Sequence, residues 1–295
     1  METKHALITG ATSGIGYELA KLFAEDGYNL VLVARSEENL RETAMEMEQL
    51  NSDIHTHIIA TDLFEHGAAQ KVYDRTTELG ITVNVLVNDA GQGEWGRFIK
   101  TDLQREMDII QLNIISLVSL TKFYLKEMVA RNEGRILQLA SSVSKAPSPY
   151  LSVYAATKAF VLSFSEALIE ELEDTEVTVT ALQPDATDTD FFHKAKAENS
   201  ITYKERDLYT PEEVAKAGYE GLMKGSSTVV PGFINKAQAV LNVVMPDSAI
   251  AANMHKQMES SMKEDGRQSS SHPASQRERS RINSEKDGIN GDYQK

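Results

Sequence analysis

The stretch from His5 to Gly16 constrains the fold of this chain more than any other. Residues 5–9 form a short apolar run, and the glycine-rich turn Thr9-Gly10-Ala11-Thr12-Ser13-Gly14-Ile15-Gly16 leads from it into helical periodicity at residues 17–26. Glycines in such a turn let the backbone approach a pyrophosphate, whose charge is favoured by the amides and dipole of the helix N-terminus. Taken alone, the pattern also fits a simple turn between a strand and a helix.

The rest of the chain repeats the alternation of strand and helix. Apolar runs of strand length recur at residues 28–34, 54–60, 83–87, 135–140, 177–182 and 228–230, with helical periodicity between them. Tyr28–Ala34 is almost continuously apolar, as expected of a parallel strand that is buried on both faces. We therefore predict an α/β fold, a single Rossmann-like doubly wound parallel sheet of about seven strands with helices on both faces.

Composition excludes several classes of function. The 295 residues include no cysteine, so disulfides, thiolate metal sites and cysteine nucleophiles are excluded, and no histidine spacing suggests a metal site. The formal net charge of −14 disfavours nucleic-acid binding, which needs a basic surface. Without a leader or an apolar run of about 20 residues, we expect no membrane span and a cytoplasmic location.

Three regions are predicted along the chain. Residues 1–235 would form the dinucleotide-binding catalytic domain, 236–262 an amphipathic C-terminal helical extension interrupted at Pro246, and 263–295 a disordered polar tail. The extension could pack on the domain, join an interface or touch a membrane surface, and packing is the default. Residues 190–210 lack clear periodicity and are expected to form a mobile lid, before a helix that begins at Thr210-Pro211.

The residues after the second strand indicate which dinucleotide would bind. Arg35-Ser36 stands where an acidic residue would take a ribose 2′-hydroxyl, and arginine accommodates a 2′-phosphate instead. This favours NADP over NAD. The alternative is that Arg35 is only solvated and that Ser36 only caps the next helix, which it can do in addition.

Polar or small residues follow nearly every later strand. In an open parallel sheet, ligands bind in the crevice at these carboxyl ends of the strands. The predicted cofactor contacts are Gly10, Thr12, Ser13, Gly14, Ile15, Gly16, Arg35, Ser36, Asp62, Leu63, Asn88, Ala90, Gly91, Tyr154, Lys158, Pro184, Thr187 and Thr189. One polar residue, Asn113, lies inside an apolar helix instead, where its amide costs stability unless it is paired.

Tyr154 and Lys158 lie four residues apart in a predicted helix, which puts both side chains on one face. A tyrosine that titrates near neutrality needs its pKa lowered from about 10, a change worth roughly 4 kcal/mol. An ammonium about 4 Å away supplies a similar amount at an effective dielectric near 20. A Y-x-x-x-K pattern alone is more often a pair of surface side chains. The motifs upstream are what favour a functional interpretation of this pair.

Together these motifs resemble the short-chain dehydrogenase/reductase family over roughly residues 3–235. The ordered set is T-G-x-x-x-G-I-G at Thr9–Gly16, Asn-Asp-Ala-Gly at 88–91, the intrahelical Asn113, Ser141 thirteen residues before Tyr154, and Lys158. The sequence around Ser141 and Tyr154 is similar to that of a broad bacterial branch of generic NADP-dependent oxidoreductases.

The resemblance implies roles for four residues. Tyr154 would be the general acid in carbonyl reduction and the base in alcohol oxidation, with its pKa lowered by Lys158, which would also bind the nicotinamide ribose. Ser141 would hold the substrate oxygen, with Ser142 as the less favoured claimant, and Asn113 would anchor a water that links Lys158 to solvent. The implied partners are a small carbonyl or alcohol and a second copy of the chain, in a homodimer or homotetramer.

The chain departs from the family pattern at two positions. Asp89 stands where asparagine is more usual, and Asp185 follows Pro184 where glycine is usual. Both carboxylates are expected near the cofactor region, where an unsatisfied charge would be costly. Because the catalytic set is intact, we interpret them as local variation.

Three functions remain open from the sequence. The leading hypothesis is NADP(H)-dependent interconversion of a carbonyl and an alcohol, and its enzymatic rival is a 3-oxoacyl thioester reductase or 3-hydroxy acid dehydrogenase. The third is a non-catalytic NADP(H)-binding sensor. Substrate choice would depend on wall residues such as Gln92, Trp95, Tyr150, Phe191 and Phe192.

Overall fold

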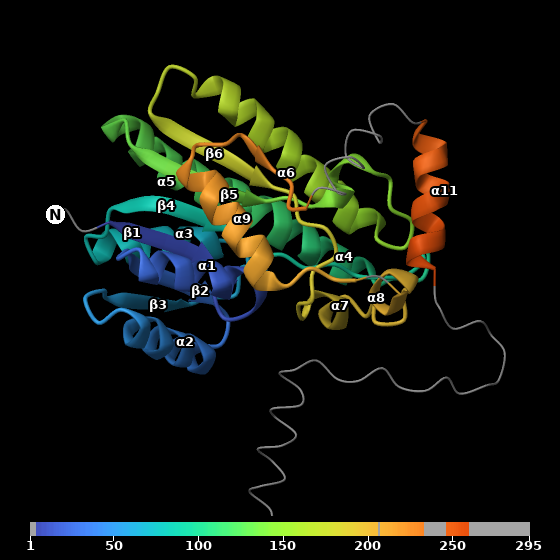
Figure 1. Cartoon of the computed structure of the whole chain (residues 1–295), viewed down its shortest axis with the longest axis horizontal. Helices are drawn as coiled ribbons and strands as arrows, with labels where there is room; N and C mark the ends of the chain where they lie inside the picture. The colour runs from blue at the N-terminus through green and yellow to red at the C-terminus, as the bar shows by residue number, and fades with distance from the viewer. Residues whose placement is uncertain (1–3, 206, 233–245, 260–295) are drawn as a thin grey trace, which may run out of the picture. The chain divides into compact units, whose positions relative to one another are not determined.

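The computed structural model describes residues 4–205, 207–232 and 246–259 of the chain. Its centre is a seven-stranded sheet in the order β3-β2-β1-β4-β5-β6-β7, in which every neighbouring pair is parallel (Figure 1). The strands are β1 (His5–Thr9), β2 (Asn29–Ala34), β3 (Thr56–Ala60), β4 (Val83–Asn88), β5 (Gly134–Leu139), β6 (Val177–Leu182) and β7 (Thr228–Val229). This confirms the predicted Rossmann-like sheet, and the strand order reverses between β1 and β4, where ligands bind in such folds.

Helices cover both faces of the sheet. On one face, buried side chains of α1 (Gly14–Glu25), α2 (Glu37–Leu50) and α9 (Pro211–Met223) pack against strands β1, β2, β4 and β6. On the other, α3 (Ala68–Glu78), α5 (Leu117–Arg131) and α6 (Ser152–Glu171) do the same (Figure 1). The core therefore consists of two apolar layers, one on each face of the sheet. The helices leave the carboxyl ends of the strands available for a ligand site.

The first helix begins earlier than predicted. We expected α1 from Tyr17, where the apolar periodicity starts, but it begins at Gly14 inside the glycine turn. Gly10 and Gly14 have positive φ angles of 71° and 60°, which an L side chain rarely adopts. At Gly16 a Cβ would lie 2.6 Å from the Gly10 carbonyl oxygen, so only glycine permits this close packing of helix on strand.

Residues 103–131 form one continuous helical stretch with an irregular centre. It runs from α4 (Leu103–Ile110) through a π-helical turn, η1 (Gln111–Ser116), into α5. By length and composition it could cross a membrane, although half of its most apolar window is buried in this fold. Our expectation rested on uninterrupted apolar runs, which Asn113 and Ser116 break, and so it overlooked this stretch.

The expected lid contains regular structure that the sequence did not reveal. It holds two short helices, α7 (Phe191–Lys194) and α8 (Ile201–Glu205), whose buried side chains form a small apolar cluster of their own. Farther along the chain, α11 (Asp247–Met258) packs on α8, and Pro246, where we expected the extension to be interrupted, is its N-cap. Residues 233–245 and the predicted polar tail lie outside the described residues.

Candidate active site

Tyr154 and Lys158 come from the first turns of α6 and face the carboxyl ends of β4 and β5. The Lys158 ammonium donates to the Leu139 carbonyl oxygen at 2.6 Å and lies 5.8 Å from the centroid of the Tyr154 ring. Lys158 is buried and Tyr154 half-buried. The i,i+4 spacing therefore brings the two side chains together, as predicted.

The structure distinguishes between the two candidate serines. Ser141 is hydrogen-bonded to the Tyr154 side chain and caps a short 3-10 helix, η2 (Ser142–Lys145). The Ser142 hydroxyl instead donates to the Asp185 carboxylate at 3.0 Å. Ser141 is thus the serine beside the phenol, and the unusual Asp185 carboxylate accepts a hydrogen bond from the other serine.

Asn113 sits in the π-helical turn and is buried. Its amide nitrogen donates to the Gln92 carbonyl oxygen and to the Thr157 hydroxyl, both at 2.9 Å, while its oxygen accepts from the Gln92 amide at 3.0 Å. A π-turn inside an α-helix often marks a functional site. Here the π-turn directs the Asn113 side-chain amide toward α6 and the loop after β4. The contact between Asn113 and a water stays a prediction.

Asp89 lies against the glycine turn. Its carboxylate is hydrogen-bonded to the Gly16 amide, but its Oδ1 atom is buried with no hydrogen-bond partner. Burial raises the pKa of Asp89 to about 7, while the charge of Lys158 opposes that rise. Burial lowers the pKa of Lys158 to about 8, while the charge of Asp89 opposes that fall. The two residues therefore form a buried electrostatic pair that the sequence did not predict.

The pKa of Tyr154 moves in the direction opposite to our expectation. Burial raises it to about 12, the Asp89 charge raises it further, and the hydrogen bond with Ser141 lowers it. Desolvation penalises the phenolate more than the surroundings stabilise it. In this structure the Lys158 ammonium is bound to a backbone carbonyl, so the sequence argument overestimated what one nearby cation does to the phenol.

The glycine turn and the residues after β2 and β3 form the expected cofactor side. A Cβ added to Gly14 would lie 3.1 Å from the methyl group of Thr189, the residue just before the expected lid. Arg35 is exposed, with its guanidinium 5.7 Å from the centroid of the Phe64 ring. Ser36 caps α2 by accepting from the Asn39 amide, as its alternative role predicted.

The remaining residues that we predicted to contact the cofactor differ in burial. Thr12, Ser13, Ala90 and Gly91 are half-buried around the crevice, whereas Ile15, Leu63, Pro184 and Thr187 are buried. Asn88 is buried too, and its amide donates to Thr121 and Gln138. It therefore links β4 to α5 and β5.

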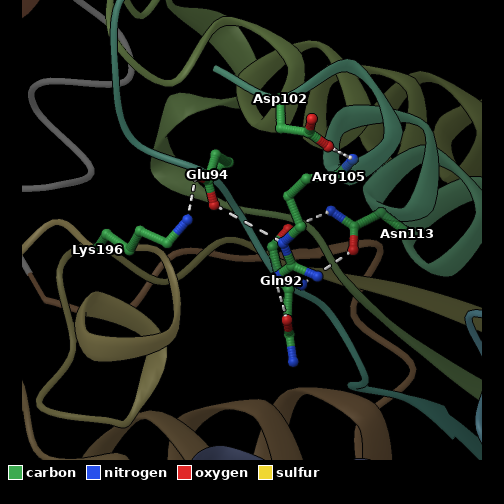
Figure 2. Close-up of polar contacts among 6 residues, drawn as sticks. All are labelled: Gln92, Glu94, Asp102, Arg105, Asn113 and Lys196. Carbon is green, nitrogen blue, oxygen red and sulfur yellow. Dashed lines mark hydrogen bonds and ion pairs between the residues drawn. The ribbon is translucent and has the colours of Figure 1, made fainter. Parts of the chain in front are cut away.

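Sequence reasoning missed a polar network beside the catalytic helix, which we call the Glu94 network and which Figure 2 shows. Glu94 is buried and accepts from Lys196 at 2.7 Å, and its other oxygen lies 3.7 Å from Arg105 Nε. Arg105 in turn donates to the side chain of Gln92, whose backbone holds Asn113. In the sequence, Glu94, Arg105 and Lys196 are ordinary charged residues of loops and helix surfaces, and no local pattern predicts that they meet.

Of the predicted wall residues, Phe191 contacts the phenol, and the others make contacts nearby in the lid, α11 and the loop after β4. The Phe191 ring packs on Tyr154 with centroids 4.8 Å apart, and Trp95 stacks on Tyr150 at 5.7 Å. The indole nitrogen of Trp95 donates to the Met258 carbonyl oxygen of α11, and Phe192 is buried in the lid cluster. Among the described residues, no group of three histidines or carboxylates could hold a metal ion.

Comparison with known proteins agrees with this geometry. Residues 4–200 match the short chain dehydrogenase family model. The chain is 36% identical over 179 residues to a very-long-chain 3-oxoacyl-CoA reductase of Mycosarcoma maydis, a match covering 60% of this chain but only 51% of that protein. It is 32% identical over 236 residues to the reductase of the same name from Anas platyrhynchos, covering 77% of this chain and 72% of the relative.

Solved structures share the fold. A short-chain dehydrogenase from Sphingobium yanoikuyae in complex with NADPH has a TM-score of 0.73 and 28% identity, covering 82% of this chain and 96% of that one. Among similar structures the bound cofactor is NADPH in one case and NAD in another. With the family model matched over most of the chain and the Ser141, Tyr154 and Lys158 set assembled in the crevice, this protein belongs to the short-chain dehydrogenase/reductase family.

Proposed function

We propose that this protein is an NADP(H)-dependent oxidoreductase that interconverts a carbonyl and an alcohol. The observation that carries the proposal is the contact of the Tyr154 hydroxyl with Ser141, one helical turn from the buried ammonium of Lys158. Proton donor, oxygen-binding hydroxyl and cation thus converge at the carboxyl ends of β4 and β5, next to the glycine turn.

The residues present fit a nicotinamide dinucleotide. Gly10 and Gly14, both with positive φ, turn the chain at the N-terminus of α1, where the helix amides and dipole would favour a diphosphate. When bound, the cofactor supplies the hydride that reduces the carbonyl carbon. Arg35 would bind the 2′-phosphate, and Lys158 would bind the nicotinamide ribose.

The protein's own part is placement and proton transfer. With its pKa raised to about 12, Tyr154 is protonated at neutral pH, which is the form that donates a proton to the carbonyl oxygen. Ser141 would hold that oxygen beside the phenol. In the reverse direction, the proton of the alcohol would pass to the Tyr154 phenolate, so alcohol oxidation would need the phenol to lose its own proton first.

The cofactor preference rests on Arg35 and is tested by thermal shift. Ligand that binds only the folded state raises Tm, so at equal concentrations NADPH should raise it more than NADH. Arg35→Glu should reverse the order, because a carboxylate repels the 2′-phosphate. The matched control is Arg41→Glu, since Arg41 is exposed on α2, where it pairs with Glu37. Equal shifts in the wild-type chain would contradict the preference.

A second candidate is reduction of a 3-oxoacyl thioester. It is favoured by the two relatives named as very-long-chain 3-oxoacyl-CoA reductases, of which the fungal one is matched over about half its length. Oxidation of NADPH should be followed with 3-oxoacyl-CoA esters of several chain lengths and with simple ketones. Turnover of thioesters alone would select this candidate, and tight NADPH binding without any turnover would select a non-catalytic sensor instead.

A homo-oligomer is part of the proposal. Large apolar side chains are exposed on α4, η1 and α6, including Leu103 (70% exposed), Met107 (51%), Ile115 (49%) and Phe160 (42%). The three elements are in mutual contact, so these side chains lie on neighbouring elements. Exposed apolar side chains gathered in this way are typical of an interface between copies.

A further inference from the structure

The catalytic phenol is covered by a single aromatic side chain of the lid. The ring of Phe191, the first residue of α7, packs against the Tyr154 ring with centroids 4.8 Å apart and an interplanar angle of 47°. Gly93 lies against both rings. A Cβ added there would be 3.0 Å from Phe191 Cζ and 3.3 Å from Tyr154 Cδ2. A methyl group at this position would therefore press on both rings.

The backbone on the lid side of this contact is held in place. The Phe191 amide donates to the Thr189 hydroxyl at 3.2 Å, and the next residue, Phe192, is buried in the lid cluster. At the other end of α7, the Ala195 carbonyl oxygen accepts from the Trp95 amide at 2.8 Å. The short helix that carries Phe191 is therefore bound to the loop that carries Gly93.

The loop side is held by the Glu94 network (Figure 2). Gln92, just before Gly93, is bound through its backbone to the Asn113 side chain, and Glu94, just after it, is paired with Lys196 at the end of α7. Gly93 thus lies between two anchored residues. Withdrawal of the loop from the Tyr154 ring would break its hydrogen bonds with Asn113, and withdrawal of α7 would break the Lys196–Glu94 pair and the Trp95–Ala195 hydrogen bond.

We propose that Phe191 and Gly93 form a size-selective gate over Tyr154, which admits carbonyl compounds with a slim, unbranched substituent and rejects those with branched or aryl groups on both sides. Phe191 is a specificity-determining residue in this assignment, and the Glu94 network positions it. The gate rests on the proposed carbonyl chemistry of Tyr154. It adds a substrate shape to that chemistry, which neither the motifs nor the relatives specify.

The gate is tested with a series of ketones, from linear methyl ketones to branched and diaryl ketones. For Phe191→Ala, the ratio of kcat/KM for bulky over linear ketones should rise at least about tenfold, since misfit of even one methylene in a pocket changes specificity by roughly that amount. For Phe191→Leu, this ratio should lie between those of the wild-type chain and Phe191→Ala. His193→Ala is the matched control, because this side chain is 84% exposed on the same short helix.

Gly93→Ala tests the opposing wall. The added methyl group would push on the Phe191 ring, so kcat/KM for linear ketones should fall, and the fall should be smaller in the Phe191→Ala background. Such non-additivity is expected only of residues in contact. Additive effects of the two substitutions would overturn the gate.

A readout without turnover separates the gate from the proposed function. Nitration of Tyr154, mapped by peptide mass spectrometry, should be faster in Phe191→Ala than in the wild-type chain and unchanged in His193→Ala. If the wild-type chain reduces no ketone but nitration follows this order, the gate stands and the proposed substrate class is wrong. If ketones are reduced but neither the size ratio nor the nitration changes in Phe191→Ala, the gate is wrong and the proposed function stands.

Discussion

At the scale of single residues, the site depends on how one phenol, one ammonium and one carboxylate share a buried space. Asp89 and Lys158 each have a pKa displaced by burial and partly restored by the other's charge. Tyr154 lacks such a partner and is protonated at neutral pH. The state of the pair therefore sets the field in which Tyr154 gives up its proton.

Tyr154→Phe should abolish turnover while NADPH binding is retained. The substitution removes the proton donor but keeps the ring that packs on Phe191. General acid catalysis typically contributes about 10²–10⁴ in rate, so kcat should fall by at least that factor. The measurement is steady-state kinetics beside a thermal-shift titration with NADPH. Substantial remaining turnover would mean that another group donates the proton.

Asp89→Asn should stabilise the protein at and above pH 7 and change little at pH 4. The pKa of Asp89 is about 7 in the folded chain and near 4 when unfolded, so folding takes up a proton between these values and stability falls as pH rises through them. Asparagine lacks this dependence and can still accept from the Gly16 amide. The gain in Tm should grow from pH 4 to pH 7 and correspond to a few kcal/mol at most, on the order of 1.4 per pKa unit.

Thermal unfolding across this pH range measures the difference directly. A gain that is the same at every pH would mean that Asp89 is not protonated on folding in this window. Removing the carboxylate also lowers the pKa of Lys158 further, since the Asp89 charge raises it. The alkaline side of any activity profile should therefore shift to lower pH in the variant.

At the scale of elements, local sequence signals decide helix ends, and tertiary contacts decide what lies between them. The start of α9 carries a complete capping box. The Thr210 hydroxyl accepts from the Glu213 amide at 3.2 Å, and the Glu213 carboxylate accepts from the Thr210 amide at 3.0 Å. The π-turn at Asn113 has no such local signature and depends on contacts with Gln92 and Thr157.

Thr210→Ala should destabilise the protein by about 1 kcal/mol, the usual value of a lost helix cap. For a domain of this size, the corresponding fall in Tm is roughly 2–4 °C. Cofactor binding should be unchanged, because the cap lies outside the crevice. Glu212→Gln is the matched control, since Glu212 is exposed in the same first turn of α9. A loss of NADPH binding in Thr210→Ala would contradict a purely local role.

Removal of the chain from residue 246 onward should expose the single tryptophan. Trp95 donates to the Met258 carbonyl oxygen, and the ring of its neighbour Tyr150 contacts His255 of α11. Without α11 the indole would be hydrated, so its fluorescence emission should shift to longer wavelength. Truncation after residue 259 is the control that keeps the helix. Identical emission from the two truncated proteins would show that α11 does not pack on Trp95 in solution.

At the scale of the whole molecule, the exposed apolar side chains on α4, η1 and α6 bear on assembly. Ile115→Glu should weaken or dissociate the proposed oligomer, because a charge placed in an apolar interface must be desolvated. Light scattering after size-exclusion chromatography would report the change in mass. Leu50→Glu is the control, since Leu50 is 48% exposed but lies on α2, on the other face of the sheet. A wild-type monomer at working concentration would contradict the assembly.

The sequence determined the architecture and which side chains meet at the candidate site. Alternating apolar strands and amphipathic helices leave a doubly wound sheet as the way to bury both kinds of face, and the i,i+4 spacing places Tyr154 and Lys158 together whatever surrounds them. The cap at Thr210 and the glycine turn are also local, since φ angles and nearby amides decide them.

The tertiary structure alone decided the electrostatics and the walls of the site. A pKa depends on burial and on charges from distant parts of the chain, so the rise at Tyr154 and the pairing of Asp89 with Lys158 could not be deduced from spacing. The Phe191 gate and the Glu94 network join residues about a hundred positions apart. Periodicity carries no information about which loops meet, and it is the meeting of the loops that shapes the space above the phenol.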